Sequence, residues 1–143
     1  MDVLFKQLDE TLEAPAYARP GDAGLDLRAA EGGTLLPFER ALVPCGIALA
    51  VPEGYAGLII PRSGLAARQG ISIVNAPGLI DSGYRGEIKV PLRNQGSEPY
   101  TVQPGERIAQ MLVVPVLTPE LTLTDDLGSS ERGEKGFGSS GRN

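Results

Sequence analysis

Acid–base chemistry in this chain has to come from carboxylates, lysines, tyrosines or a bound metal, because its 143 residues include no histidine. The absence of histidine excludes Ser-His-Asp hydrolysis, Cys-His proteolysis and histidine-ligated zinc. The single cysteine, Cys45, excludes an intramolecular disulfide and a multi-cysteine metal site. A carboxylate is therefore the first candidate for a general base.

Five segments are richer in Gly, Asp, Arg and Ser than a loop requires. They are residues 22–27 (DAGLDL), 61–66 (PRSGLA), 75–88 (NAPGLIDSGYRGEI), 105–110 (GERIAQ) and 132–141 (RGEKGFGSSG). Each has a plain alternative interpretation, namely a turn, a capped helix, a simple hairpin, a core strand and a disordered tail. The chemistry that they can support together is what makes them candidates.

The segment 75–88 is the most informative, and we expect it to form a β-hairpin. Its arms would hold the amide of Asn75, the carboxylate of Asp81 and the ring of Tyr84 close together. Backbone N–H and C=O groups of such a hairpin can read the edge of a flat base. Asp81 can orient and deprotonate a water molecule, and Tyr84 can pack flat against a sugar.

The other segments favour binding of phosphate. Residues 61–66 form a strand end that runs into a short helix, where free N–H groups, Ser63 and Arg62 can bind an anion. Gln110 lies in an apolar strand, so its amide is either a satisfied core group or a group that positions water. The tail can close over a nucleotide, with its backbone N–H groups on phosphate and Phe137 stacked on the base, although composition alone favours disorder.

The elements that would position these residues are mostly short strands. Nineteen glycines and twelve prolines divide the chain into many short segments, which predicts one all-β domain. We expect strands over residues 1–6, 41–51, 57–60, 87–92, 100–102 and 107–116, and one helix over residues 63–69. Pro44 and Pro91 indicate edge positions or bulges. Residues 1–123 form the predicted body, and residues 124–143 a flexible arm.

The five segments, taken in order, closely resemble the five motifs of the trimeric dUTPase family. The resemblance implies a compact jelly-roll-like (β-clip) subunit that forms a homotrimer with active sites at the subunit interfaces. It also implies hydrolysis of dUTP to dUMP and pyrophosphate, which limits uracil incorporation into DNA and supplies dUMP for thymidylate synthesis. The arm of one subunit would close a site built by the other two.

The resemblance also assigns roles to individual residues. The position matching Asp81 holds the attacking water, together with Gln110, and Tyr84 excludes a 2′-hydroxyl. Asn75 and the backbone near Leu79 and Ile80 read uracil. The remaining positions bind substrate or belong to the closing arm: Arg62, Ser63, Gly64, Lys89, Arg132, Phe137, Gly138, Ser139 and Ser140. Mg²⁺ would be held by phosphates and waters, with Asp26 no nearer than the second coordination shell.

Two departures from the family pattern lie in the arm, where Lys135 replaces a glycine and Ser140 replaces a threonine. We expect activity to persist with altered arm dynamics. Two rival functions stay open at this point, a dCTP deaminase of the same fold class and a non-catalytic trimeric binding module. The deaminase needs a glutamate beside the cytosine amine, and alternation along the strand turns Glu87 away from Asn75.

Net charge and hydropathy limit the kinds of partner that we expect for this chain. The net charge of −5 argues against nucleic acid as a partner. The apolar runs are too short to span a bilayer, so no membrane partner is expected. A reducing cytoplasm is the simplest compartment for a chain with one cysteine.

Overall fold

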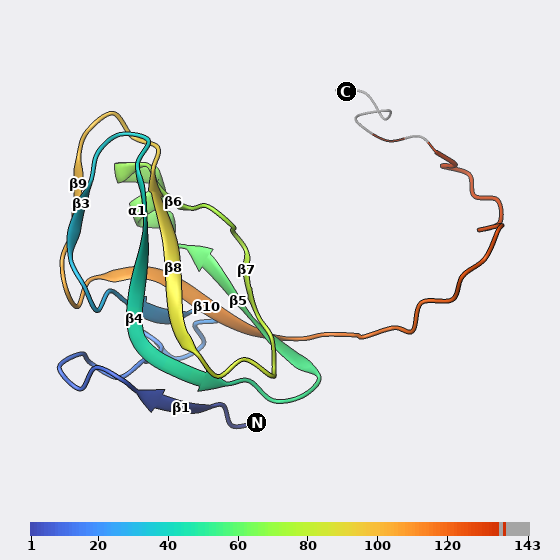
Figure 1. The fold of residues 1–143 in the computed structure, drawn as a ribbon, viewed down its shortest axis with the longest axis horizontal. Coiled ribbons are helices and arrows are strands. Elements are labelled where there is room, and N and C mark those ends of the chain that lie inside the picture. The colour runs from blue at the N-terminus through green and yellow to red at the C-terminus, as the bar shows by residue number, and fades with distance from the viewer. Residues whose placement is uncertain (135, 137–143) are drawn as a thin grey trace.

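The computed structural model describes residues 1–134 and 136 of the chain. It contains ten strands and one short helix within that part: β1 Leu4–Gln7, β2 Leu25–Arg28, β3 Gly33–Leu35, β4 Arg40–Ala50, β5 Tyr55–Pro61, α1 Ser63–Gln69, β6 Ile71–Ile73, β7 Gly78–Ile80, β8 Glu87–Asn94, β9 Tyr100–Val102 and β10 Arg107–Pro115. The all-β prediction is confirmed, and the predicted helix has the observed bounds. Each predicted strand is also present, with ends that differ by a few residues (Figure 1).

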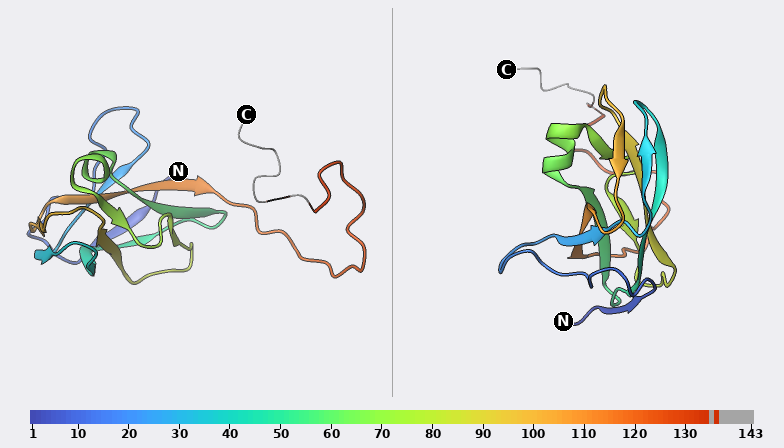
Figure 2. Two further views of the ribbon diagram at one scale, coloured as in Figure 1. Left: turned by 90° about the horizontal axis from the view of Figure 1, so that it is seen from above. Right: turned by 90° about the vertical axis from the view of Figure 1, so that its left-hand side faces the viewer.

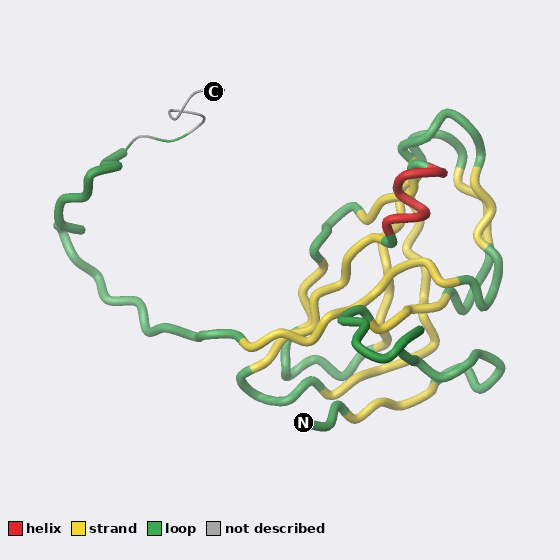
Figure 3. Tube along the Cα trace, turned by 180° about the vertical axis from the view of Figure 1, so that it is seen from behind, coloured by secondary structure: helices red, strands yellow, loops and turns green. Residues whose placement is uncertain are grey.

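The strands form two four-stranded antiparallel sheets and a small two-stranded one. The first sheet has the order β1-β4-β8-β6, the second has the order β2-β10-β5-β7, and β3 pairs with β9. Most neighbours in a sheet are distant in sequence, so the fold depends on long-range pairing. Figures 2 and 3 show the strands wrapped around one another, with α1 at one end of the body.

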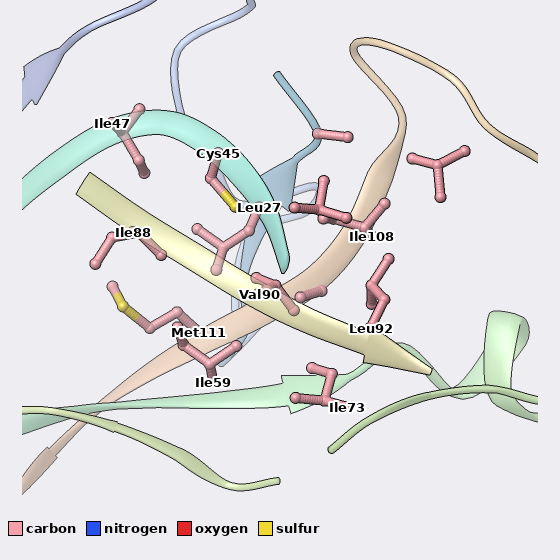
Figure 4. Packing of buried hydrophobic residues seen from close by; sticks show 14 of the residues in the cluster. Leu27, Cys45, Ile47, Ile59, Ile73, Ile88, Val90, Leu92, Ile108 and Met111 are labelled. Atoms are coloured by element: carbon pink, nitrogen blue, oxygen red, sulfur yellow. The ribbon is translucent and has the colours of Figure 1, made fainter. Parts of the chain in front are cut away.

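The core fills the space between the two large sheets (Figure 4). Ile88, Val90 and Leu92 of β8 are fully buried and meet Leu27 of β2 and Met111 of β10. They alternate along β8 with half-buried and exposed residues, which is the pattern expected for a strand with one face on the core. This packing fixes β10 and β8, the strands that carry or flank the candidate site residues.

Pro44 and Pro91, the two prolines inside strands β4 and β8, each lie beside an irregularity in the backbone pairing. The pairing of β4 with β8 shifts register between Pro44 and Ala48, which is the predicted bulge. The carbonyl of Pro91 accepts the N–H of Val74 just past the end of β6, so the missing N–H of Pro91 faces a position where no strand continues.

The helix α1 ends at Gly70, whose φ of 68° is left-handed. Its N–H is directed to the carbonyls of Ala66 and Leu65, a common way to end a helix. The nearby Asn94 is fully buried and satisfied, because its amide donates to the carbonyls of Leu35 and Glu98 and accepts the N–H of Gly96. Asn94 thus ties the end of β8 to the end of β3 and to the loop between β8 and β9.

The predicted hairpin over residues 75–88 is wrong in its strand pairing. Its first arm, β7, pairs with β5, whereas its second arm, β8, pairs with β4 and β6. The two arms therefore belong to different sheets. Local alternation and turn residues mark the strands, but the partners that outcompete hairpin pairing lie far away in the sequence.

Beyond β10 the described chain has no regular secondary structure and leads away from the body (Figures 1 and 2). Four leucines in this segment, Leu117, Leu121, Leu123 and Leu127, are each more than 90% exposed. The predicted boundary at residue 124 stays a prediction. In the part of the chain that the structure describes, no helix is long and apolar enough to cross a membrane.

Candidate active site

A cavity of about 420 Å³ lies where three of the five segments meet. Its lining comes from the first segment (Asp22, Ala23, Gly24, Asp26), the second (Arg62, Ser63, Gly64) and the fourth (Arg107, Gln110), together with Ala18, Ile60 and Leu112. Five of the residues predicted from the sequence, Asp26, Arg62, Ser63, Gly64 and Gln110, are therefore brought together here.

The position of β10 explains this convergence. Gln110 on β10 is the register partner of Asp26 on β2 and of Ile60 on β5. Because neighbouring strands lie about 4.8 Å apart, side chains on the same face of these strands are close together. Pairing between strands distant in sequence thus places segments one, two and four on one side of the sheet.

An ion-pair network crosses the cavity wall. One carboxylate oxygen of Asp26, Oδ2, lies 3.0 Å from Nη1 of Arg107, and the other, Oδ1, lies 3.4 Å from Nε of Arg62. The Asp26 side chain is only 14% exposed. A carboxylate this buried needs charged partners, and two guanidinium groups supply them.

Arg107 is a site residue that reasoning from the sequence did not single out. Residues three apart on a regular strand point to opposite faces, yet Arg107 and Gln110 both line the cavity. The register of β10 with β2 shifts between Arg107 and Ala109, and this bulge turns both side chains to the same face. The sequence pointed to Arg107 only as an arginine inside the fourth segment. The alternation of apolar and polar residues along a strand does not reveal a bulge.

Gln110 is half-buried, and its amide is oriented by the backbone around it. Its Nε2 donates to the carbonyl of Pro61 at 3.3 Å. Its Oε1 faces Gly24, where a Cβ atom would come within 2.4 Å. The amide is thus held at the cavity edge rather than inside the core.

Ser63 and Gly64 begin α1 at the cavity. The carbonyl of Arg62 already accepts the N–H of Ala66, and no side chain among the described residues caps the helix start. The N–H groups of the first helical turn have no acceptor within the helix. They are available to an anion in the cavity, next to Arg62.

The residues of the third segment form a second group around β7 and the turn that follows it. Asn75 and Asp81 are exposed. Tyr84 donates its hydroxyl to the carbonyl of Glu87 at 2.9 Å, and a Cβ on Gly86 would collide with its ring. The glycine therefore lets the Tyr84 ring lie against the backbone as a fixed surface, 42% exposed.

The structure does not bring the two groups together within one chain. On β7, Gly78 pairs with Ile59, Leu79 with Leu58 and Ile80 with Gly57. Asp81 therefore continues toward the Tyr55 end of β5, whereas Arg62 follows its other end. Gly57 is the partner of Ile80, the residue before Asp81. At about 3.3 Å per residue, the five steps along the chain from Gly57 to Arg62 span roughly 16 Å.

Lys89 does not line the cavity that Asp26, Arg62 and Gln110 share. Lys89 projects from the outer face of β8, 3.8 Å from the carboxylate of Glu87, and lines a different cavity of about 620 Å³. Its predicted role at the nucleotide site stays a prediction. Phe137, Gly138, Ser139 and Ser140 lie outside the described residues, and Arg132 is described but far along the tail.

Among the described residues, no group of three or more His, Cys, Asp or Glu side chains could hold a metal ion. Two carboxylates, Asp22 and Asp26, line the cavity nonetheless. Oxygen donors of this kind suit a hydrated Mg²⁺ that is carried in by phosphate groups.

A cavity lined by two arginines and the start of a helix, as here, is suited to a phosphorylated ligand, and it lies in an antiparallel all-β body. Comparison with known proteins narrows this class. The dUTPase family model matches residues 10–141, and the chain therefore belongs to the dUTPase family.

Relatives match along most of their length. The chain is 58% identical over 131 residues to the deoxyuridine 5'-triphosphate nucleotidohydrolase of Anaeromyxobacter sp., covering 92% of this chain and 89% of the relative. It is 53% identical over 140 residues to the enzyme of the same name from Thermobifida fusca, covering 97% of this chain and 78% of the relative.

Solved structures agree with this family. The Staphylococcus bacteriophage 80alpha dUTPase with dUpNHpp superposes with a TM-score of 0.91 at 34% identity, covering 99% of both chains. A mutant dUTPase from phage phi11 of S. aureus, described with the coordination of a structural Mg(II) ion, gives a TM-score of 0.83 at 27% identity, covering 90% of this chain and 100% of that one. The β-clip subunit expected from the sequence is thus confirmed.

Proposed function

We propose that this protein hydrolyses dUTP to dUMP and pyrophosphate, and thereby limits uracil incorporation into DNA and supplies dUMP for thymidylate synthesis. Membership of the dUTPase family and the arginine-lined cavity support this activity. The water would attack the α-phosphorus in line with the leaving pyrophosphate. Such a reaction depends on positioning the water and on neutralising phosphate charge.

The active site would be assembled from several copies of the chain, in a homotrimer. The observation that carries this proposal is the location of Arg62 and Asp81 beyond opposite ends of β5, because this arrangement keeps the phosphate-binding group of one chain away from its own Asp81. Four leucines beyond β10 are almost fully exposed, which supports docking of this segment on a neighbouring copy. Arg132, Phe137, Gly138, Ser139 and Ser140 would then close over the site of another copy.

Within the assembled site, each group has a separate task. Asp81 of one copy and Gln110 of another would hold the attacking water. Asn75, with the backbone of Leu79 and Ile80, would read uracil, and Tyr84 would lie beneath the deoxyribose and exclude a 2′-hydroxyl. The fixed position of the Tyr84 ring against Gly86 supports a steric role of this kind.

The phosphates would bind at the cavity. Arg62, Ser63 and the first N–H groups of α1 offer charge and hydrogen bonds to a triphosphate. Lys89 would contribute a further positive charge if a neighbouring copy brings substrate near the outer face of β8. When bound with the nucleotide, Mg²⁺ supplies additional neutralisation of phosphate charge, and Asp26 would contact only its waters.

A cytoplasmic location accompanies this proposal. Cys45 is buried and free, which suits a reducing compartment. The substrate dUTP and the copies of the chain are the proposed partners, with no role for nucleic acid or membrane.

The position of Glu87 argues against the deaminase alternative. Its carboxylate accepts the N–H of Gly46 and lies near Lys89, on the outer face of β8. A deaminase would need this glutamate beside the base-reading Asn75, which precedes β7 in the other sheet.

The first experiment measures pyrophosphate release from dUTP, dCTP, dTTP and UTP, with and without Mg²⁺. Rapid release from dUTP alone is expected, and stimulation by Mg²⁺ is expected with it. Ammonia release from dCTP would favour the deaminase, and binding without turnover of any nucleotide would favour a non-catalytic module.

A second experiment tests assembly between copies by mixing two inactive variants, Asp81→Asn and Arg62→Gln. If copies mix at random after joint refolding, about a quarter of the shared sites regain both intact residues, so activity should return. A site formed within one chain would give no recovery. Mixing either variant with itself provides the control.

A further inference from the structure

Arg107 contacts both other charged members of the cavity wall. Its Nη1 lies 3.0 Å from Oδ2 of Asp26, and its backbone carbonyl accepts a hydrogen bond from Nη1 of Arg62 at 2.9 Å. Arg62 also approaches Asp26 through Nε at 3.4 Å. The three residues therefore form a closed triangle of contacts.

The triangle determines which part of Arg62 is available to a ligand. A guanidinium group carries its donors in one rigid plane. Two nitrogens of Arg62 are engaged, Nε with Asp26 and Nη1 with the Arg107 carbonyl, which fixes that plane. Nη2 is left for a ligand in the cavity that Arg62 lines.

Arg107 also balances the charge of the cavity lining. The charged side chains that line the cavity are Asp22, Asp26, Arg62 and Arg107. Without Arg107, two carboxylates would face one guanidinium, in a protein whose net charge is already −5. The net negative charge of the lining would then repel an anionic ligand. Asp26 would also have Arg62 as its one remaining counter-ion in the cavity wall and would hold it more tightly.

We propose that Arg107 is a positioning residue for phosphate binding, which neutralises Asp26 so that the positive charge and free Nη2 of Arg62 remain available to the triphosphate. This inference rests on the proposed function only in taking a nucleoside triphosphate as the ligand. Arg107 acts through Asp26 and Arg62. Its effect must therefore depend on the charge of Asp26, whereas a purely structural effect would not.

The test is a double-mutant cycle on binding in the absence of Mg²⁺. Wild type, Arg107→Gln, Asp26→Asn and the double variant are titrated calorimetrically with dUpNHpp and, in parallel, with inorganic tripolyphosphate. Arg107→Gln should weaken binding of both ligands at least about tenfold. In the Asp26→Asn background the same change should cost less than about threefold, because no carboxylate remains to be neutralised.

The matched control is Arg28→Gln. Arg28 is the register partner of Arg107 on β2 and donates to the carbonyl of Gly105, but it pairs with Glu13 outside the cavity. Binding by this variant should match wild type. Arg107→Lys, which keeps the charge but loses the planar fork, should show a smaller loss than Arg107→Gln and provides the same cycle if the glutamine variant does not fold.

Two results would overturn the inference: wild-type affinity in Arg107→Gln, or an equal loss with and without the charge of Asp26. Failure of the proposed function is distinguishable, because it shows in the wild-type protein as absence of dUTP turnover. The tripolyphosphate cycle still reports on Arg107 in that case.

Discussion

The amide of Gln110 packs against Gly24 so closely that a single added carbon would come within 2.4 Å of its Oε1. Gly24 is therefore required by the space that Gln110 occupies rather than by backbone conformation. This contact joins the loop before β2 to the central strand β10 and sets where the amide lies at the cavity edge.

The variant Gly24→Ala should displace Gln110 and lower kcat by roughly ten- to hundredfold, since small misplacements of a group near the reaction are costly. The fold should persist, with little change in the far-UV spectrum. Gly33→Ala is the control, because a Cβ there would meet nothing within 4 Å. Equal kinetics for the two variants would show that the position of Gln110 does not matter.

The variant Asp81→Asn should lose at least about a hundredfold in turnover while its Kd for dUpNHpp stays within about threefold of wild type. The exposed carboxylate would act on the water rather than hold the substrate. Single-turnover kinetics and calorimetry measure the two quantities, with Asp2→Asn as a surface control. Binding and turnover lost together would count against the assignment.

Deletion of residues 129–143 should leave a folded protein of unchanged oligomeric state that hydrolyses dUTP at least about tenfold more slowly. The leucines between residues 117 and 127 are retained, so any docking between copies is preserved. Light scattering measures assembly, and pyrophosphate release measures activity. Full activity in the truncated protein would refute the role of the arm.

Replacement of the buried Asn94 by leucine should lower the free energy of unfolding by about 2–4 kcal/mol. The change leaves the carbonyls of Leu35 and Glu98 and the N–H of Gly96 without the partner that Asn94 provides. Urea unfolding measures the loss, with the exposed Gln95→Ala as control. A loss below about 0.5 kcal/mol would mean that these backbone groups find other partners.

Alkaline pH should destabilise the protein through Cys45. Burial, with the nearby Glu87 carboxylate, raises the pKa of the Cys45 thiol from 9.0 to about 12. Above pH 9 the thiol ionises only in the unfolded chain, so the free energy of unfolding falls by about 1.4 kcal/mol per pH unit. The fall ends near pH 12, where the folded state ionises as well.

The measurement for Cys45 is urea unfolding at several pH values, compared with Cys45→Ala, whose stability should fall less steeply. Tyr100 adds a slope common to both proteins, because burial and its hydrogen bond to Glu106 also raise the pKa of that phenol. Parallel stability curves for the two proteins would contradict the prediction.

Much of the fold was predictable from the sequence, because strands such as β8 alternate cleanly and α1 begins at Ser63 and ends before Gly70. The pairing of these strands was not predictable in the same way. Residues 75–88 contain the turns and alternation of a hairpin, yet β7 pairs with β5 in a different sheet from β8. Turn chemistry reports on neighbours in sequence, whereas sheet order is decided by burial of the whole core.

The candidate site was predictable in its residue types and only partly in its geometry. Asp26, Arg62 and Gln110 meet as expected because β10 lies between β2 and β5. Arg107 was missed because its orientation depends on a bulge, which changes the face of a side chain without changing the sequence pattern. The separation of Asp81 from these residues follows from the direction of β7 along β5, which no local pattern encodes.

The position of the two residue groups beyond the ends of β5 has a consequence for how this family of chains can vary. If identical copies share their sites, the span of β5 becomes a dimension of the whole assembly, repeated in every copy. One residue inserted into β5 would shift the Asp81 group relative to the Arg62 group by about 3.3 Å. It would also turn the β5 side chains on one side of the insertion to the opposite face of the sheet. Every site would then fail at once, although no site residue had changed. Strand length at β5 should accordingly tolerate less variation than the identity of the residues along it.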